Sequence, residues 1–250
     1  MESVRKPYQG LWNCIRFNWH YYLLSIVLVV LLNLSNRFLT DELCEISYFI
    51  IFLVIASTII SLAVSFYVYD LSDVYKLNWF DELSTTFNSK TININAGFDE
   101  VSALLYAKYP DVSLTVYDFY DPIKHTEVSI QRARKAYSPF GGTLKINTTS
   151  LPLPDNCADI VLLIFSAHEI RNEIERSIFF NELKRILKPS GKIVLLEHLR
   201  DIPNFFAYNI GFFHFMSKNT WCNTFKSAGL NISKEKKITP FTTSFILKKC

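Results

Sequence analysis

The chain has 250 residues, which is enough for one α/β domain and an additional segment. Half of the residues are hydrophobic and the net charge is only +3, without the clustered basic residues of a nucleic-acid footprint, so we expect no nucleic-acid partner. An odd number of cysteines without C-x-x-C spacing argues against a disulfide framework or a structural zinc site and fits a reducing compartment: Cys14, Cys44, Cys157, Cys222 and Cys250.

Two apolar runs near the start predict a membrane anchor over residues 1–69. Residues 46–69 contain no charged side chain, and a helix of that length crosses the roughly 30 Å hydrocarbon core. The run at residues 21–34 is shorter and follows aromatic residues of the kind found at membrane interfaces, beginning with Trp19. We predict two spanning helices, at about residues 20–35 and 46–69. For the first run, an interfacial helix or a signal peptide is the alternative, but no small-x-small cleavage site follows it.

The charges that flank these runs predict their orientation. The stretch before the first run carries Arg5, Lys6 and Arg16, whereas residues 35–45 between the runs carry Arg37 against three acids. Because basic residues mark the cytoplasmic side, two spans return the chain there, and we expect a multi-pass membrane protein with a cytoplasmic domain. Residues 70–89 form the predicted linker, whose aromatic residues suggest a short helix against the membrane or the domain.

The first half of the domain, which we place at residues 90–250, predicts alternating strands and helices. Residues 91–94 form a short strand, residues 95–99 a turn and residues 100–108 a helix. The next strand, residues 113–117, ends at Asp118. Residues 143–147 form a third strand that ends at Asn147.

The second half predicts a strand–helix–strand unit. Residues 160–165 have the continuous apolar character of a strand buried on both faces, and residues 192–198 form the next strand. Between them, isoleucines and leucines recur at helical spacing: Ile170, Ile174, Ile178, Leu183 and Leu187. The segment Lys188-Pro189-Ser190-Gly191 should end this helix, with Gly191 in a left-handed turn. Polar residues then lie where ligands bind in such sheets, at 166–169 and 197–198.

The last part of the chain predicts a lid, a helix and two strands. Residues 201–217 are crowded with aromatic side chains, which suit either a cover over an apolar substrate or packing against the core or membrane surface. Residues 219–228 form a helix that Gly229 ends. Residues 230–236 and 241–248 form the final pair of strands.

Several of these motifs together resemble the class I S-adenosylmethionine-dependent methyltransferases. The marks are Leu151-Pro152-Leu153-Pro154-Asp155 before a buried strand, Leu187-Lys188-Pro189-Ser190-Gly191 before the next, and Glu197-His198 at its end. The resemblance covers roughly residues 90–248 and implies a doubly wound, Rossmann-like sheet of seven mostly parallel strands. It also implies S-adenosyl-L-methionine as the cofactor.

The resemblance implies where the cofactor binds. In the family a glycine-rich first turn approaches the cofactor, and an acid after the second strand accepts hydrogen bonds from both ribose hydroxyls, a role that would fall to Asp118 here. The cap of a turn is the alternative for Asp118. The amide of Asn147 would lie near the adenine. The full set of implied cofactor-binding residues is Asn95, Ala96, Gly97, Asp118, Phe119, Asn147, Thr148 and Ser166.

The first turn departs from the family pattern. Asn93 stands where the family has an acid, Asn95 replaces the first glycine, Gly97 is retained and Asp99 replaces the last glycine. Asparagine tolerates positive φ, so the turn can still form. The side chain at position 95 would crowd the cofactor unless it bonds to it.

The candidate catalytic residues are His168, Glu169, His198 and His214. His168 is the leading candidate for a base, since it follows the fourth strand and histidine titrates near neutrality. A cap or a structural hydrogen bond is its alternative, and core packing is the alternative for His214. No H-x-x-x-H or H-E-x-x-H spacing is present, so we predict no metal.

These inferences predict a membrane-anchored methyltransferase that acts on a small, hydrophobic acceptor such as a quinone, lipid or aromatic metabolite. The partners are then this acceptor and the lipid bilayer. Two other classes remain open: a ligand-binding protein without activity and a membrane scaffold. The sequence does not indicate the oligomeric state.

Overall fold

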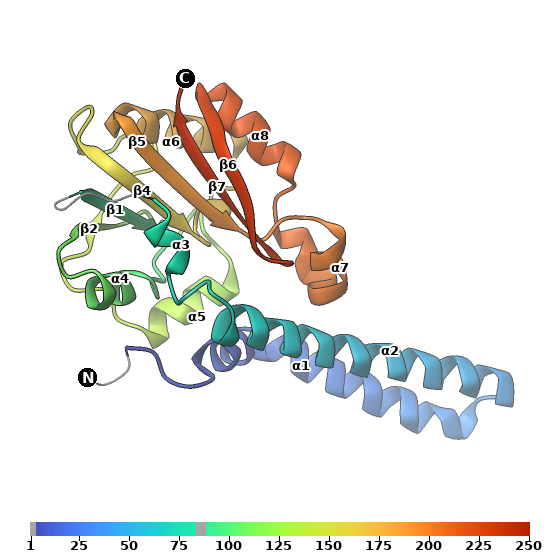
Figure 1. Cartoon of the computed structure of the whole chain (residues 1–250). Helices are drawn as coiled ribbons and strands as arrows, with labels where there is room; N and C mark the ends of the chain where they lie inside the picture. Colours follow the sequence, from blue (N-terminus) through green and yellow to red (C-terminus); the bar gives the residue numbers. More distant parts are fainter. Residues whose placement is uncertain (1–3, 84–88) are drawn as a thin grey trace.

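A seven-stranded sheet in the order β3-β2-β1-β4-β5-β7-β6 forms the centre of the domain (Figure 1). The computed structural model describes residues 4–83 and 89–250. The strands β1 to β5 are parallel to one another, whereas β7 is antiparallel to both β5 and β6. Their bounds are β1 Lys90–Asn95, β2 Ser113–Asp118, β3 Leu144–Lys145, β4 Ala158–Ile164, β5 Leu187–Glu197, β6 Leu230–Thr239 and β7 Thr242–Lys249. This is the doubly wound, mostly parallel sheet that the sequence predicted.

Both faces of the central strands are buried. Along β4, Val161 and Leu163 face a cluster that includes the helices α6 (Glu173–Ile186) and α8 (Lys218–Ser227). The alternating residues Ile160, Leu162 and Ile164 face the opposite cluster, which includes α4 (Ser102–Lys108). The continuous apolar character of this strand therefore follows from its position between two layers of helices.

Helix α6 buries a different face from the predicted one. Ile174 and Ile178, expected in the buried stripe, are exposed. Leu183 is buried as predicted, and so are Ile170 and Leu187 outside the helix. The other buried side chains of the helix are Arg176, Phe179, Phe180 and Ile186. The helix ends at Ile186, so Leu187 begins β5. The chain offers two apolar stripes here, and the one with two phenylalanines buries more apolar surface.

Gly191 also has a different role from the predicted one. It lies inside β5 rather than in a turn, and the positive-φ glycines are Gly97, Gly142 and Gly229. A Cβ at Gly191 would come within 2.8 Å of two Leu187 side-chain atoms and 3.0 Å from the Ala158 carbonyl oxygen. Glycine is thus needed for close packing against β4, and the register of the two strands shifts at this place.

Other predicted elements differ only at their ends. Helix α4 begins at Ser102 rather than at residue 100, because the Asp99 carboxylate accepts hydrogen bonds from the Val101 and Ser102 amides, both at 2.9 Å. Strand β3 keeps only two of its five expected residues, and Asn147 lies in an isolated bridge with Ser150. Helix α8 and the pair β6 and β7 form as predicted, and Gly229 with φ +62° follows the helix.

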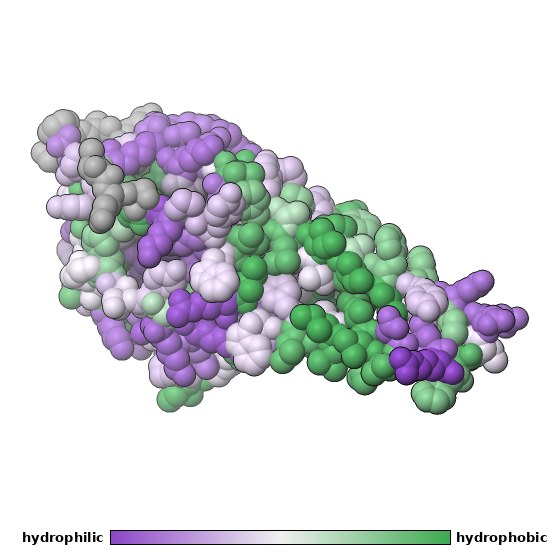
Figure 2. Space-filling model, turned by 90° about the horizontal axis from the view of Figure 1, so that it is seen from below, coloured by the Kyte–Doolittle hydropathy of each residue, from purple (hydrophilic) through white to green (hydrophobic). Residues whose placement is uncertain are grey.

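An antiparallel pair of long helices extends from the domain (Figure 1). Helix α1 spans Gln9–Ser35, the 3-10 turn η1 spans Asn36–Phe38, and α2 spans Asp41–Phe66. We call α1, η1 and α2 the hairpin. Both helices are long and apolar enough to cross a membrane, with mean hydropathies of 1.6 and 2.6, and only 6% of the most apolar stretch of each is buried. Figure 2 shows a hydrophobic surface along the hairpin that ends at a hydrophilic tip.

The residues after α2 belong to the domain core. The π-helical turn η2 (Tyr67–Leu71) and the short helix α3 (Asn78–Asp81) cover one face of the sheet. Their buried side chains and those of the adjoining turns contact β4 and β5: Val68, Val74, Leu77, Trp79, Phe80 and Leu83. The predicted short helix therefore packs against the domain. Residues 84–88 of the expected linker lie outside the described residues.

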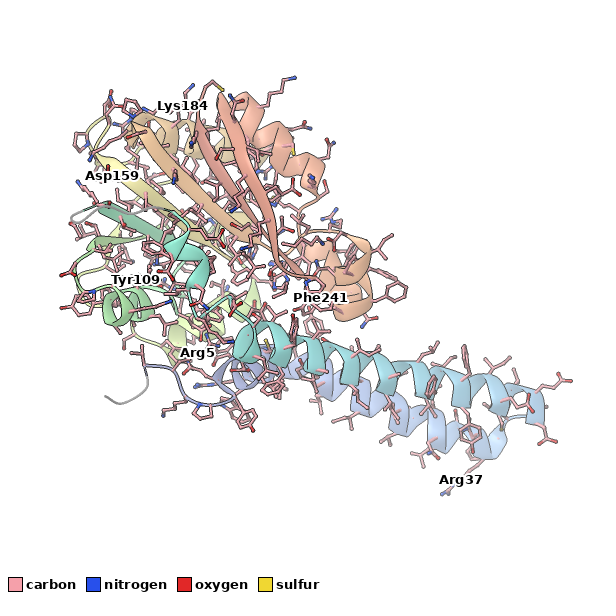
Figure 3. The ribbon with its side chains drawn as sticks, in the orientation of Figure 1. Arg5, Arg37, Tyr109, Asp159, Lys184 and Phe241 are labelled. Atoms are coloured by element: carbon pink, nitrogen blue, oxygen red, sulfur yellow. The ribbon has the colours of Figure 1, made fainter. Side chains whose placement is uncertain are left out.

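Polar contacts fix the base of the hairpin to the domain. The Asp70 carboxylate accepts hydrogen bonds from the Gly10 and Leu11 amides at 2.8 and 2.7 Å, which caps the start of α1. Glu100 accepts hydrogen bonds from Asn13 and Tyr75, and Arg5 pairs with it at 3.4 Å. Figure 3 shows Arg5 at this base and Arg37 at the far tip of the hairpin.

Candidate functional site

The first turn, residues 95–99, lies where β1 ends. The Gly97 amide donates to Oδ1 of Asn95 at 2.8 Å, and Gly97 has φ +91°, which favours glycine. Asn95 is buried, yet its Nδ2 has no hydrogen-bond partner among the described residues, and the same holds for Oδ2 of Asp99. A buried donor without a partner costs free energy, so Asn95 is suited to bind an incoming acceptor such as a carboxylate.

Asp118, predicted to hold the ribose, pairs instead with an arginine. Its carboxylate is buried at the end of β2, and Oδ2 lies 2.7 Å from Nη1 of Arg134 on helix α5 (Val128–Ala136). The same Nη1 would lie only 1.7 Å from a Cβ at Gly97. The Arg134 guanidinium therefore covers the first turn and leaves about 10 Å³ of space beside Asp118.

A larger pocket of about 400 Å³ lies beside the residues that follow β2 and β3. Among the predicted cofactor residues it is lined by Phe119, Asn147 and Thr148, while His125 and Glu175 line it as well. The ring of Phe119 packs edge-on against His125, with centroids 5.4 Å apart. An apolar ring and amide groups at the ends of β2 and β3 suit a planar heterocycle such as adenine.

The remaining predicted cofactor residues lie beneath the surface. Ala96 is buried in the core, and Ser166 is buried with its hydroxyl donating to the Ile94 carbonyl at 2.9 Å. Ser166 thus links the end of β4 to β1. Together, the free Asn95 amide, the Asp118 carboxylate and the pocket beside Phe119 fit S-adenosylmethionine. The side chain of Arg134 lies over Gly97 and pairs with Asp118, so a cofactor bound to this carboxylate would have to displace it.

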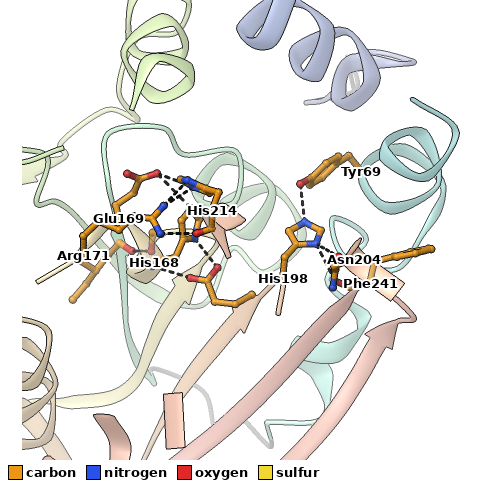
Figure 4. Close-up of polar contacts among 11 residues, drawn as sticks. Tyr69, His168, Glu169, Arg171, His198, Asn204, His214 and Phe241 are labelled. Atoms are coloured by element: carbon orange, nitrogen blue, oxygen red, sulfur yellow. Dashed lines mark hydrogen bonds and ion pairs between the residues drawn. The ribbon is translucent and has the colours of Figure 1, made fainter. Parts of the chain in front are cut away.

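A second group of polar residues gathers at the ends of β4 and β5 (Figure 4). His168, in the 3-10 turn η3 (Ala167–Glu169), has its Nδ1 2.7 Å from Oε2 of Glu197, and its amide donates to Oε1 of that residue. Its Nε2 lies 3.4 Å from Oε1 of Glu169. Burial opposes the charged imidazole, but the carboxylates of Glu197 and Glu169 outweigh it and raise the pKa of His168 to about 10.

His214 completes this group from a distant segment. It ends the 3-10 helix η4 (Asn209–His214), and its ring meets that of His168 edge-on at 4.9 Å. The Arg171 guanidinium contacts both ring nitrogens of His214 and its carbonyl. Burial and the positive charges of His168 and Arg171 lower the pKa of His214 to about 3. His168 therefore carries a proton at neutral pH and His214 is neutral.

The fold assembles a cluster that the sequence spacing did not indicate. One nitrogen of each of His168 and His214 and one oxygen of Glu169 lie within 4.8 Å of one another, which is close enough for a metal ion. The proton on His168 and the guanidinium of Arg171 already supply positive charge to Glu169 and Glu197.

His198, the fourth predicted catalytic residue, lies in a separate buried network (Figure 4). Its Nδ1 donates to the Phe241 carbonyl at 2.9 Å, and its Nε2 accepts from the Tyr69 hydroxyl at 2.8 Å. Its ring stacks on Phe165 and Phe215. Burial lowers the pKa of His198 to about 4, so the ring is neutral. The structure does not bring His198 to the His168 cluster. The hydrogen bond between His198 and Tyr69 instead joins η2 to the sheet.

Sequence reasoning missed Arg134 as part of the site. It lies on a polar helix, and no local pattern distinguishes it from its exposed neighbour Lys135. Its role follows only from the way α5 crosses the ends of β1 and β2. Arg171 is close to His168 in the sequence, but its contact with His214 depends on how residues 201–217 fold back.

Comparison with known sequences agrees with this geometry. Residues 108–195 match the family described as Methyltransferase domain. The chain is similar to the ubiquinone/menaquinone biosynthesis C-methyltransferase UbiE of Geotalea daltonii, with 28% identity over 114 residues, covering 44% of this chain and 46% of that protein. It is 33% identical over 91 residues to UbiE of Geobacter sulfurreducens, covering 35% and 33%. The matched segment thus spans less than half of each of these relatives.

Comparison with solved structures supports the fold. The PH0226 protein from Pyrococcus horikoshii aligns with a TM-score of 0.53 at 15% identity, covering 71% of this chain and 89% of that one. Human N-acetylserotonin methyltransferase, solved in complex with S-adenosylmethionine, aligns with a TM-score of 0.52 at 16% identity, covering 78% and 55%.

The sheet order, the matched family and these neighbours define a class I S-adenosylmethionine-dependent methyltransferase domain. Within that class, the sequence relatives described above are quinone C-methyltransferases of the UbiE type.

Proposed function

We propose that this protein is a membrane-anchored methyltransferase that uses S-adenosylmethionine to methylate a small hydrophobic acceptor, of which a quinone-like ring is the leading case. The observation that carries the proposal is the charged His168 held between Glu197 and Glu169 at the end of β4. The UbiE relatives support a quinone-like acceptor, and the apolar hairpin supports a substrate dissolved in the membrane.

The cofactor residues have separate tasks in this proposal. Asp118 would accept the ribose hydroxyls once Arg134 has moved away, and Asn95 and Gly97 would face the methionine portion. Phe119, Asn147 and Thr148 would hold the adenine. Bound S-adenosylmethionine supplies a methyl group on a sulfonium that is already a strong electrophile. The protein mainly has to align the acceptor with it and control the acceptor's proton.

The pKa of His168 changes the role expected for it. A general base must be neutral before it accepts a proton, whereas a pKa of about 10 keeps His168 charged at pH 7. A charged imidazole suits an acceptor that reacts as an oxyanion, because it can donate a strong hydrogen bond to that oxygen. We therefore assign His168 to hold a deprotonated acceptor hydroxyl. Glu197 fixes its ring through Nδ1, and Nε2, which faces Glu169 at 3.4 Å, would redirect its proton to the acceptor oxygen.

The anchor and its orientation complete the proposal. Two spans with the basic residues on the domain side would leave the domain in the cytoplasm, which is also the compartment that fits five unpaired cysteines. An anchored enzyme meets a membrane-dissolved acceptor without first extracting it into water.

Quinol and lipid extracts, supplied with labelled S-adenosylmethionine to the full chain in lipid nanodiscs, test this function. We expect label in an apolar product, and His168→Gln should lower turnover by about 10² to 10⁴ while cofactor affinity stays nearly constant. His20→Gln is the matched control, since His20 lies on α1 beside Arg132, outside both the cluster and the pocket. Cofactor binding without any labelled product would support the alternative of a ligand-binding protein, for which Arg134 over the first turn is the favouring observation.

The pH dependence separates the two roles of His168. If the charged imidazole is the active form, turnover falls as pH rises through about 10, where the proton is lost. If the neutral imidazole is the active form, turnover rises over the same range. His168→Gln should remove the dependence in either case, and a rising profile would reject the oxyanion-binding role.

A further inference from the structure

The segment formed by α7 (Ile202–Tyr208) and η4 buries a polar side chain and exposes apolar ones, which is the reverse of a surface that faces water. Asn204 is fully buried and donates to the Asp201 carboxylate at 2.8 Å and to the Phe241 carbonyl at 3.1 Å. In contrast, five large apolar side chains are between 46% and 80% exposed: Ile202, Phe205, Phe206, Ile210 and Phe213. Several such residues in one short segment form a patch that water does not favour.

This segment lies beside the hairpin. Helix α7 contacts α2, and the ring of Phe241 meets that of Tyr67 at the end of α2. In Figure 1, α7 is the part of the domain that reaches furthest along the hairpin, and Figure 3 places Phe241 between them. The exposed apolar residues of α7 and η4 therefore continue the apolar surface of α2.

The free length of the hairpin determines how close the domain comes to a bilayer. The start of α1 is covered by the domain, with Gly10, Asn13 and Phe17 buried. Beyond them, residues 19–35 span about 25 Å at 1.5 Å per residue, whereas the hydrocarbon core is about 30 Å thick. A hairpin of this length leaves no gap between the membrane surface and the domain. Exposed Trp19, Tyr21 and Tyr67 lie at the domain end, as aromatic residues do at an interface.

We propose that α7 and η4 rest in the interface of the bilayer, with Phe206, Ile210 and Phe213 among the lipid headgroups and upper acyl chains, as a third membrane contact besides the two helices. The inference rests on the proposed membrane anchor and deepens it. An element with polar groups inside and apolar groups outside is stable when its surroundings are lipid. The last residue of this element, His214, contacts His168, so lipid lies directly behind one wall of the site.

Depth-dependent fluorescence quenching tests the contact without using activity. A single cysteine replaces Ile210 in a full-length chain whose native cysteines are changed to serine, and it carries an environment-sensitive dye. The chain is placed in phosphatidylcholine vesicles that contain lipids with a quencher near the headgroup or deep in the chain. Ile174→Cys is the matched control, because Ile174 is equally exposed but lies on α6. Leu53→Cys on α2 reports the hairpin itself.

We expect the dye at position 210 to be quenched by the shallow quencher at least threefold more than the dye at position 174, and the dye at position 53 by the deep quencher. Equal quenching at 210 and 174, with strong quenching at 53, would reject this contact and leave the anchor standing. No quenching at 53 would reject the anchor and this inference together. Neither result depends on methyl transfer, which is measured separately with labelled cofactor.

Discussion

Arg134 makes two features of the cofactor site depend on one side chain. It pairs with Asp118 and covers Gly97, so in the proposed cofactor site the ribose and this guanidinium would compete for the same carboxylate. Arg134 also lies over the ring of Tyr120, which gives it a second contact at this position. More than one interaction therefore stabilises the observed position of Arg134, and the proposed cofactor site requires this position to change.

We expect substitutions of Asp118 and Arg134 to change the affinity for S-adenosylmethionine in opposite directions. Asp118→Ala should weaken S-adenosylmethionine binding by about 1.5 to 3 kcal/mol, because the ribose hydroxyls lose a charged acceptor. Arg134→Gln should tighten binding by about 1 kcal/mol, since a partly exposed competitor is removed. Calorimetry on the solubilised full chain measures both, with exposed Lys135→Gln on the same helix as the control. Weaker binding by Arg134→Gln would mean that the arginine holds the cofactor.

The position of Asp118 in the proposed cofactor site could be predicted from the sequence, whereas the position of Arg134 could not. Asp118 is recognisable because it ends a strand, and the end of a parallel strand has a known place in the fold. The same rule located His168 and Glu197. Arg134 and His214 come from segments whose paths across the sheet depend on tertiary packing, so their contacts could not be derived from spacing. His198 shows the opposite error, since a strand end placed it near the site but its ring turns to Tyr69.

At the scale of elements, α6 shows how periodicity can select the wrong face. The isoleucine stripe and the phenylalanine stripe both have helical spacing, and only packing against the sheet decides between them. The strands were easier to predict because both faces of a central strand are buried, so any register leaves an apolar run. The weakest strand, β3, lies at the edge of the sheet with both residues exposed, and its predicted length was too great.

Unfolding measurements check the buried face of α6. Phe180→Ala should cost about 3 to 5 kcal/mol, because it removes a fully buried ring. Ile174→Ala should stay within about 0.5 kcal/mol, because that side chain is exposed. Urea unfolding of the solubilised chain gives both values. A large loss from Ile174→Ala would show that this residue has a partner, as the sequence first suggested.

The two helices of the hairpin predict where reporter fusions appear. A fusion after Glu42 joins the chain between the spans, and one after Ser89 joins it after the second span, so the two should report opposite sides of the membrane. A fusion at the N-terminus should agree with the one after Ser89. Reporters on the same side would contradict two spans, and α1 would then be the first candidate for an interfacial helix.

At the scale of the whole molecule, the shifted histidines predict how stability depends on pH. His198 and His214 are neutral in the fold, with pKa values of about 4 and 3, so their contribution is present above about pH 6.5 and is lost as pH falls towards those values. His168 is charged, with a pKa of about 10, so its contribution is complete below about pH 6.5 and is lost as pH rises through 10.

Stability should therefore be greatest near neutral pH and fall on both sides. Each proton taken up or released on unfolding changes stability by up to about 1.4 kcal/mol per pH unit. Thermal unfolding of the solubilised chain between pH 4 and pH 10 measures this, and His168→Gln should flatten the alkaline side alone. An unchanged alkaline slope in that variant would show that the ion pairs of His168 do not stabilise the fold.

The way residues 67–83 are built into the sheet has a mechanical consequence. Because η2 and α3 cover β4 and β5, the described residues that follow α2, up to Leu83, form one wall of the domain and hold the hairpin directly against it. In the proposed orientation the domain can drift sideways and spin about the membrane normal, but it cannot tumble away. Its search for an acceptor is then two-dimensional and confined to one leaflet. A fragment beginning at residue 90 would lose this wall, so a water-soluble version has to start before Val68.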